Sequence, residues 1–145
     1  MEFDLIHCHA DREYFKQDIV PLLDYPLIEF LGEIDDDAKG AFLSEALGLL
    51  FPIDWPEPFG LVMIEALACG TPVVARPCGA VSEVIAPGTG FIADTLDELV
   101  ESVKRIDTID RQVCRRHVQE RFTVGHMVDR YEAIYATLAP AARAA

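Results

Sequence analysis

Short apolar runs alternate with segments of helical periodicity, and this alternation most restricts the folds open to the chain. The runs Leu47 to Phe51 and Val73 to Ala75 contain no polar side chain, which is typical of parallel strands buried on both faces. Strand-like runs at Phe3 to His7, Leu27 to Leu31 and Phe91 to Ala93 raise the expected number of strands to about five. The sequence therefore predicts an α/β fold, with a Rossmann-like doubly wound parallel sheet and helices on both faces.

Helical signals fill the segments between and after these runs. The expected helices are 13–23 after an N-cap at Asp11, 37–46, 61–68, 96–106, 108–121 and 124–138. Beyond Thr95 every expected element is a helix, so the carboxyl end should be helical. A chain of 145 residues with 51% hydrophobic residues is sufficient for one domain, 1–145, with its own core.

The charge balance excludes several kinds of partner. A net charge of -13 argues against nucleic acid and against an anionic membrane surface, because both are bound by clustered Lys and Arg. No apolar window is long enough to predict a membrane span. The start MEFDLI lacks the features of a secretory signal, so a cytoplasmic location is expected. The four cysteines lack Cys-x-x-Cys spacing and predict neither a zinc site nor a disulfide framework.

Glu57 and Glu65 bracket the segment with the strongest functional signal. Pro58 disfavours helical geometry at Glu57, and Gly60 allows close backbone approach. From Leu61 apolar residues recur at helical spacing until a Gly-Thr-Pro sequence ends the helix. The free N–H groups at this helix start favour an anion such as a phosphate. Glu65, one turn into the helix, can accept hydrogen bonds from ligand hydroxyls.

The segment resembles the carboxyl-terminal domain of retaining glycosyltransferases with the GT-B fold, especially the group 1 or family 4 type, which carries a Glu-x7-Glu motif. The likeness extends from Glu29-Phe30-Leu31-Gly32-Glu33 to Gly88-Thr89-Gly90-Phe91 and covers about residues 26 to 136. A series of motifs in order is more specific than one pair of glutamates.

The resemblance implies a domain that binds a nucleotide-diphosphate sugar. Glu57 would contact the transferred sugar as the catalytic glutamate, Glu65 would bind the ribose hydroxyls, and the base would lie near Gly32 and Glu33. The implied contacts to sugar and diphosphate are the backbone N–H groups of Phe59, Gly60, Leu61 and Val62. Such transfer proceeds by positioning and by stabilisation of the leaving diphosphate, so no metal and no cofactor besides the donor is expected.

The amino end departs from the family pattern. Relatives begin this domain with a strand, a glycine-rich loop and a helix whose Arg and Lys hold the diphosphate. Residues 1–10 instead resemble a strand of the amino-terminal, acceptor-side domain, although a diverged strand of the carboxyl-terminal domain would look similar. The candidate replacement cations are Arg12, Lys16, Lys39 and Arg76. The chain is therefore expected to be a partial domain that is inactive alone.

Three classes of function stay open at this point. The chain could be a glycosyltransferase half completed by a separate acceptor-domain chain or by dimerisation, a non-catalytic nucleotide-sugar-binding module, or a homo-oligomeric scaffold without a ligand. His7 and His9 could share one strand face as metal ligands but lack a third. Trp55 could stack on a base or simply pack its loop. Glu83 could contact the sugar or stabilise a helix start.

Overall fold

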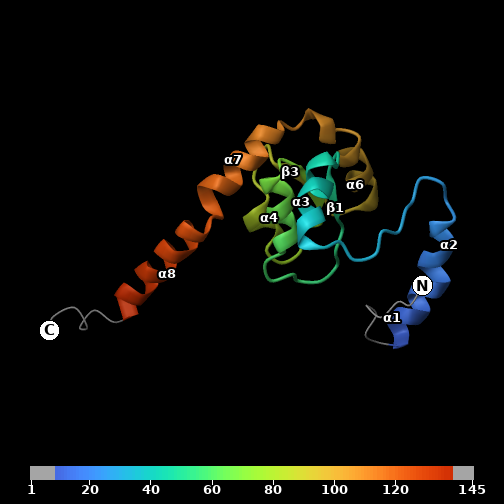
Figure 1. Cartoon of the computed structure of the whole chain (residues 1–145), viewed down its shortest axis with the longest axis horizontal. Helices are drawn as coiled ribbons and strands as arrows, with labels where there is room; N and C mark the ends of the chain where they lie inside the picture. The colour runs from blue at the N-terminus through green and yellow to red at the C-terminus, as the bar shows by residue number, and fades with distance from the viewer. Residues whose placement is uncertain (1–8, 139–145) are drawn as a thin grey trace. The chain divides into compact units, whose positions relative to one another are not determined.

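The computed structural model describes residues 9–138, which divide into two compact units at the boundary between Asp35 and Asp36 (Figure 1). The first unit is a helical segment followed by irregular backbone, and the second contains the sheet. The assignment of 1–145 to one partial domain stays a prediction.

The first unit contains one continuous helical stretch. It is made of α1 (His9–Tyr14), a π-helical turn (Phe15–Ile19) and α2 (Val20–Leu23), and so begins earlier than the expected 13–23. The irregular turn precedes Pro21, which cannot donate a backbone hydrogen bond to the preceding turn.

The strand predicted at Leu27 to Leu31 is wrong, because this segment is irregular backbone. Its apolar side chains are largely exposed, and Leu27 is 84% exposed. A strand is stable only beside another strand and against a surface that buries one face. The first unit, as far as it is described, supplies no neighbouring strand. The strand predicted at Phe3 to His7 lies outside the described residues.

The second unit alternates strands and helices in the predicted manner. Its elements are α3 (Asp36–Glu45), β1 (Leu49–Phe51), α4 (Leu61–Ala68), β2 (Val73–Ala75), α5 (Val81–Val84), β3 (Gly90–Ile92), α6 (Leu96–Val103), a 3-10 turn (Ile106–Thr108), α7 (Arg111–Arg121) and α8 (Val124–Leu138). The strands are parallel in the order β1-β2-β3, with Val73 of β2 paired to Leu49 and to Gly90. The described residues thus form three strands, where five were predicted.

Helices cover both faces of this sheet, as predicted for a Rossmann-like fold. On one face, Val73 and Ala75 of β2 join the core formed with α4 and α7. On the other face, Val74 and Leu50 line an apolar groove beside α6. β2 is buried at all three positions, which explains why its sequence has no polar residue. The α6 face is the more open one, since Leu50 is 57% exposed.

Arg111 joins three segments at the end of the sheet opposite the strand ends that lead to Glu57. Its guanidinium donates to the carbonyl oxygens of Ala46 (2.8 Å) and Ser44 (2.6 Å) and to Thr71 Oγ1 (2.8 Å). Thr71 is fully buried and itself donates to the Leu43 carbonyl at 2.5 Å. Asp110 caps α7 through the Gln112 N–H, so that helix begins at Arg111 and not at the expected Thr108.

Thr71→Val should destabilise the second unit, because it removes the buried hydroxyl that donates to the Leu43 carbonyl and accepts from the Arg111 guanidinium. We expect a loss of about 1–3 kcal/mol in the free energy of unfolding, measured by urea titration. Thr108→Val is the control, since the exposed Thr108 hydroxyl bonds only the nearby Arg105 carbonyl. Equal losses in both variants would contradict a role for the buried hydroxyl.

Candidate functional site at the carboxyl ends of the strands

The candidate site lies where the three parallel strands end. β1 leads into the loop with Glu57, β2 into Arg76, and β3 into Asp94 shortly after its end. In doubly wound sheets, ligands bind beyond the carboxyl ends of the strands. Glu57 was predicted to follow a strand end, and the structure places it there.

The Glu57 carboxylate caps the start of α4. Its Oε1 accepts from the Gly60 N–H at 3.2 Å, and its Oε2 accepts from Trp55 Nε1 at 3.2 Å. Gly60 is the N-cap residue of α4 and has φ 70°, in the left-handed region that glycine tolerates. The Trp55 indole, half-exposed, therefore orients Glu57 within the loop.

Gly79 fixes the backbone of the same loop. It has φ 56°, and a Cβ there would lie 2.1 Å from the Glu57 carbonyl oxygen and 2.5 Å from the Glu57 nitrogen. The next residue, Ala80, donates its N–H to that carbonyl at 2.9 Å. The loop after β2 thus rests directly on the backbone of Glu57, and a side chain at position 79 would separate them.

Gly79→Ala should displace the Glu57 loop and cost about 1 kcal/mol or more in stability, through positive-φ strain and backbone overlap together. Gly88→Ala is a matched control, because Gly88 has φ 86° but a Cβ there would meet only Val113 Cγ1, at 3.7 Å. Urea unfolding compares the two variants, and Trp55, the only tryptophan, reports the loop by fluorescence. The same loss in both variants, with unchanged fluorescence, would contradict this contact.

Glu65 lies one turn into α4 and is paired with a lysine from α3. Lys39 Nζ is 2.9 Å from Glu65 Oε1 and 2.8 Å from Asp36 Oδ1. Hydrogen bonds to Asp36 and then to Glu65 raise the pKa of Lys39 above its usual value, and the Lys39 hydrogen bond lowers the pKa of Asp36. Lys39 therefore stays charged and holds the Glu65 carboxylate in place.

The backbone donors at the start of α4 divide into engaged and open groups. The Gly60 N–H is taken by Glu57, and the Met63 N–H donates to the Gly60 carbonyl at 3.0 Å. Leu61 and Val62 occupy the first two helical positions, where a helix supplies no carbonyl acceptor for an N–H group. These two N–H groups are the ones best placed for an anion.

Some predicted site residues belong to the first unit and not to the unit that contains the sheet. Gly32 and Glu33 belong to the first unit, where both are exposed, as do the candidate cations Arg12 and Lys16. The placement of the nucleotide base near Gly32 and Glu33 therefore stays a prediction.

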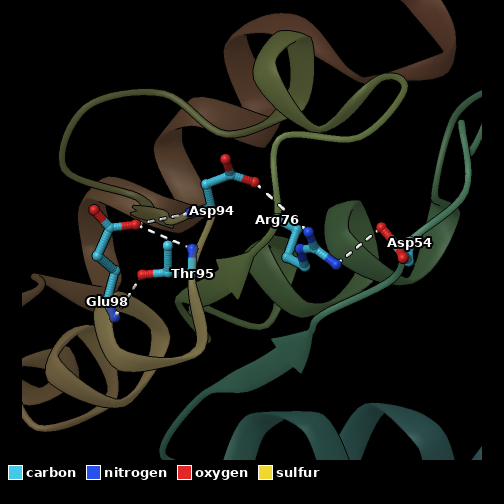
Figure 2. A network of polar contacts seen from close by, with 5 residues as sticks. All are labelled: Asp54, Arg76, Asp94, Thr95 and Glu98. Atoms are coloured by element: carbon cyan, nitrogen blue, oxygen red, sulfur yellow. Dashed lines mark hydrogen bonds and ion pairs between the residues drawn. The ribbon is translucent and has the colours of Figure 1, made fainter.

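Arg76 connects the segments that follow β1 and β3 (Figure 2). Its guanidinium lies 2.8 Å from Asp54 Oδ1 and 3.6 Å from Asp94 Oδ1. Its Nε is buried and lacks a hydrogen-bond partner among the described residues. The carboxylates of Asp54 and Asp94 thus offset the positive charge of Arg76. The sequence had suggested Arg76 as a replacement for a phosphate-binding cation of the family.

A capping box begins α6 immediately after this network (Figure 2). Glu98 Oε2 accepts from the N–H groups of Asp94 and Thr95, both at 3.1 Å, and Thr95 Oγ1 accepts from the Glu98 N–H at 3.3 Å. These hydrogen bonds, those from Thr95 first, lower the pKa of Glu98. The capping box therefore fixes the short connection between the end of β3 and the start of α6.

Glu98→Ala should lower stability at neutral pH and have less effect in acid. Because the folded-state pKa of Glu98 is depressed, its stabilisation is complete above the unfolded-state pKa of about 4.3 and disappears as pH falls through the folded value. Urea midpoints of both proteins, measured from pH 7 down to acid, should converge. A difference between the two urea midpoints that stays constant over this pH range would contradict stabilisation by an ionised Glu98.

Two grooves adjoin the start of α4. One, of about 490 Å³, is lined mainly by apolar side chains of α4 and of the α7–α8 junction, among them Phe59, Leu61, Ile64, Phe122, Met127 and Tyr131. The other, of about 380 Å³, includes Phe59, Ser82, Glu83, Arg121 and Arg130. Glu83 lies in the first turn of α5 at this second groove. The sequence analysis did not predict that the α7–α8 junction lines these grooves. The apolar spacing within 124–138 was the signal that could have indicated it.

Among the residues that the structure describes, no group of three or more His, Cys, Asp or Glu is placed to hold a metal. The side chains of His7 and His9 lie outside the described part. Between residues 9 and 138, no helix has both the length and the apolar character needed to cross a bilayer.

The parallel sheet, with the start of α4 at the carboxyl ends of its strands, defines a Rossmann-like α/β domain. The family model described as "Glycosyl transferases group 1" matches residues 16–119, and the chain belongs to this family. A sucrose-phosphate synthase from Thermosynechococcus elongatus has a similar structure, with TM-score 0.75 and 28% identity over 92% of this chain and 35% of that one. These findings confirm the predicted family and support the GT-B type of fold.

Curated relatives agree with this family. The chain is 37% identical over 68 residues to the phosphatidyl-myo-inositol mannosyltransferase of Propionibacterium freudenreichii. This matched segment is 47% of this chain and 18% of that protein. It is 33% identical over 116 residues to the N-acetyl-alpha-D-glucosaminyl L-malate synthase of Bacillus anthracis. This second match covers 73% of this chain and 29% of that protein. The chain thus spans less than a third of the length of either relative.

Proposed function

We propose that the start of α4, with Glu57 and Glu65, binds a nucleotide-diphosphate sugar as the donor for retaining glycosyl transfer. The observation that carries this proposal is the hydrogen bond from the Gly60 N–H to Glu57 Oε1, because it shows a negative group already held at this helix start. A donor phosphate would replace that carboxylate and accept from the N–H groups of Leu61 and Val62.

If a donor phosphate took the place of the Glu57 carboxylate at the Gly60 N–H, the carboxylate would become free to contact the sugar. Trp55 Nε1 would still hold one oxygen, so the side chain would stay beside the helix start while the other oxygen accepts a sugar hydroxyl. This arrangement is consistent with the catalytic role that the family resemblance implies for Glu57.

Glu65 is suited to the ribose hydroxyls of the nucleotide. Lys39 uses Glu65 Oε1, which leaves the second carboxylate oxygen and further lone pairs of the side chain as acceptors. Its side chain is 38% exposed, so a ligand can reach it. Lys39 would keep the acceptor oriented before the ligand arrives.

The names of the relatives support sugar transfer as the chemistry. One is named a mannosyltransferase, and the other a synthase of a glucosaminyl malate. The sugar and the acceptor of this chain are not assigned by those names. A cytoplasmic location stays a prediction.

We expect donor binding, rather than complete transfer, from this chain alone. Lys39 and Arg76 are the two candidate cations in the second unit, and each is paired with two carboxylates. Stabilisation of a leaving diphosphate requires positive charge directed at it. This pairing favours the non-catalytic nucleotide-sugar-binding module as the second candidate function.

Glu65→Ala should weaken nucleotide binding by about ten- to a hundredfold, the loss expected when hydrogen bonds to a charged acceptor are removed. The measurement is a calorimetric titration of the full chain with UDP, GDP and ADP, with and without their sugars. One nucleotide should bind to the unaltered chain more tightly than the others.

Glu101→Ala is the matched control, because Glu101 is also paired with a lysine, Lys104 at 2.6 Å, but lies on α6 away from the strand ends. Its binding should equal that of the unaltered chain. Absence of binding for all three nucleotides at millimolar concentration, or full binding by Glu65→Ala, would overturn the proposed donor site.

A further inference from the structure

Arg76 is held in a fixed place at the carboxyl end of β2. The carbonyl oxygen of the preceding residue, Ala75, accepts from the Ala93 N–H at 3.0 Å, and the carbonyl oxygen of Arg76 accepts from the Cys78 N–H at 2.8 Å. The Arg76 side chain is 30% exposed, and its Nε is buried. A side chain held at its base and along its stem leaves few conformations to the guanidinium, so this group can fix what it contacts.

The guanidinium of Arg76 links the loops on either side of β2 (Figure 2). It lies 2.8 Å from Asp54, in the loop after β1, and 3.6 Å from Asp94, between β3 and α6. The side chains of Asp54 and Asp94 are 80% and 74% exposed, so each ion pair alone contributes little to the free energy of unfolding. The consequence of this bridge is therefore expected in the position of the loop after β1 and not in global stability.

The loop that carries Glu57 is attached to the segment after β2 at two points. Asp54 is held by the Arg76 side chain, and the Glu57 carbonyl oxygen accepts from the Ala80 N–H at 2.9 Å. Trp55 lies between these points, and its indole Nε1 donates to Glu57 Oε2. The position of the Glu57 carboxylate thus depends on Trp55. The residue directly before Trp55 is the one that Arg76 fixes.

We propose that Arg76 is a positioning residue for Glu57, which acts through the segment 54–55. When a donor phosphate takes the Gly60 N–H, the indole of Trp55 is the contact that still holds the Glu57 carboxylate. Arg76 then determines whether that carboxylate stays beside the sugar. The consequence for the sugar rests on the proposed function of this site, whereas the chain of contacts from Arg76 to Glu57 is tested without a ligand.

Arg76→Met separates positioning from a general structural role. Methionine keeps an unbranched side chain at this place but removes the charge and the buried Nε, which lacks a hydrogen-bond partner in the described part of the chain. Loss of that donor offsets the loss of two exposed ion pairs, so the urea midpoint should change little. Arg105→Met is the matched control, because Arg105 lies 5.0 Å over the Phe91 ring and follows α6 at the far end from Asp94.

The indole N–H of Trp55 reports the loop directly, because the only tryptophan gives one indole cross-peak in a proton–nitrogen spectrum. In Arg76→Met and in Asp54→Ala, this N–H should exchange with water at least threefold faster, and its cross-peak should shift toward that of Glu57→Ala, which lacks the acceptor. The double variant at 54 and 76 should change it no further than Arg76→Met, since both single variants remove the same contact. Arg105→Met should leave it unchanged.

Arg76→Lys should recover part of the effect on the indole N–H. A lysine ammonium keeps the charge and can reach one carboxylate, but it lacks the planar fork that bridges two. If Arg76→Met does not fold, Asp54→Ala provides the same test from the exposed partner.

Calorimetry tests the consequence for the donor. For Arg76→Met we expect a three- to tenfold loss of affinity for the nucleotide-diphosphate sugar that the unaltered chain binds. The affinity for the nucleotide alone should be unchanged, because Glu65 and Lys39 keep their contact between α4 and α3. An equal loss for both ligands, or no loss for the sugar nucleotide, would overturn the role of Arg76 toward the sugar.

The two measurements have separate outcomes. An indole N–H in Arg76→Met and Asp54→Ala that matches the unaltered chain would overturn the positioning of Glu57 by Arg76, whatever the ligand result. A changed indole N–H, together with no binding of any nucleotide by the unaltered chain, would overturn the proposed donor site, while the chain of contacts from Arg76 to Glu57 would stand.

Discussion

The burial of α4 between the sheet and α7 is the interaction on which the rest of the second unit depends. Met63, Ala66 and Leu67 on this helix are fully buried against β1, β2 and α7. Because these contacts fix the axis of α4, they also fix its start at the carboxyl ends of the strands. Glu57 and Glu65 then lie on one short, rigid element and its entry loop, and their separation is set by packing and not by the ligand.

The Glu57 loop is satisfied by its own groups in the absence of a ligand. Gly79 and Ala80 hold its backbone, and the Glu57 carboxylate holds the α4 start. An anion that binds the Gly60 N–H must displace this carboxylate, so part of its interaction energy offsets the lost internal hydrogen bond. The pairing of Glu65 with Lys39 has the same consequence for a ligand hydroxyl, although Glu65 keeps free acceptor positions.

Sequence patterns predicted best those elements that have a continuous apolar run or a clear helical period. The run Val73 to Ala75 matched β2 without change, and α8 matched 124–138, because continuous burial and helical spacing leave direct traces in residue type. Leu27 to Leu31 has the same apolar character, but a pattern cannot show whether a neighbouring strand is present. The contact of Lys39 with Glu65 was missed for a related reason, since 26 residues separate them and only the packing of α3 on α4 joins them.

The sheet has two edges in the described residues, β1 and β3, each only three residues long. Unpaired strand edges are the usual starting points for aggregation, and the hazard grows with the length of exposed backbone. Such short edges offer few free N–H and C=O groups to a foreign strand. A sheet with such short edges is therefore a weaker template for a growing β-structure than a sheet with long open edges.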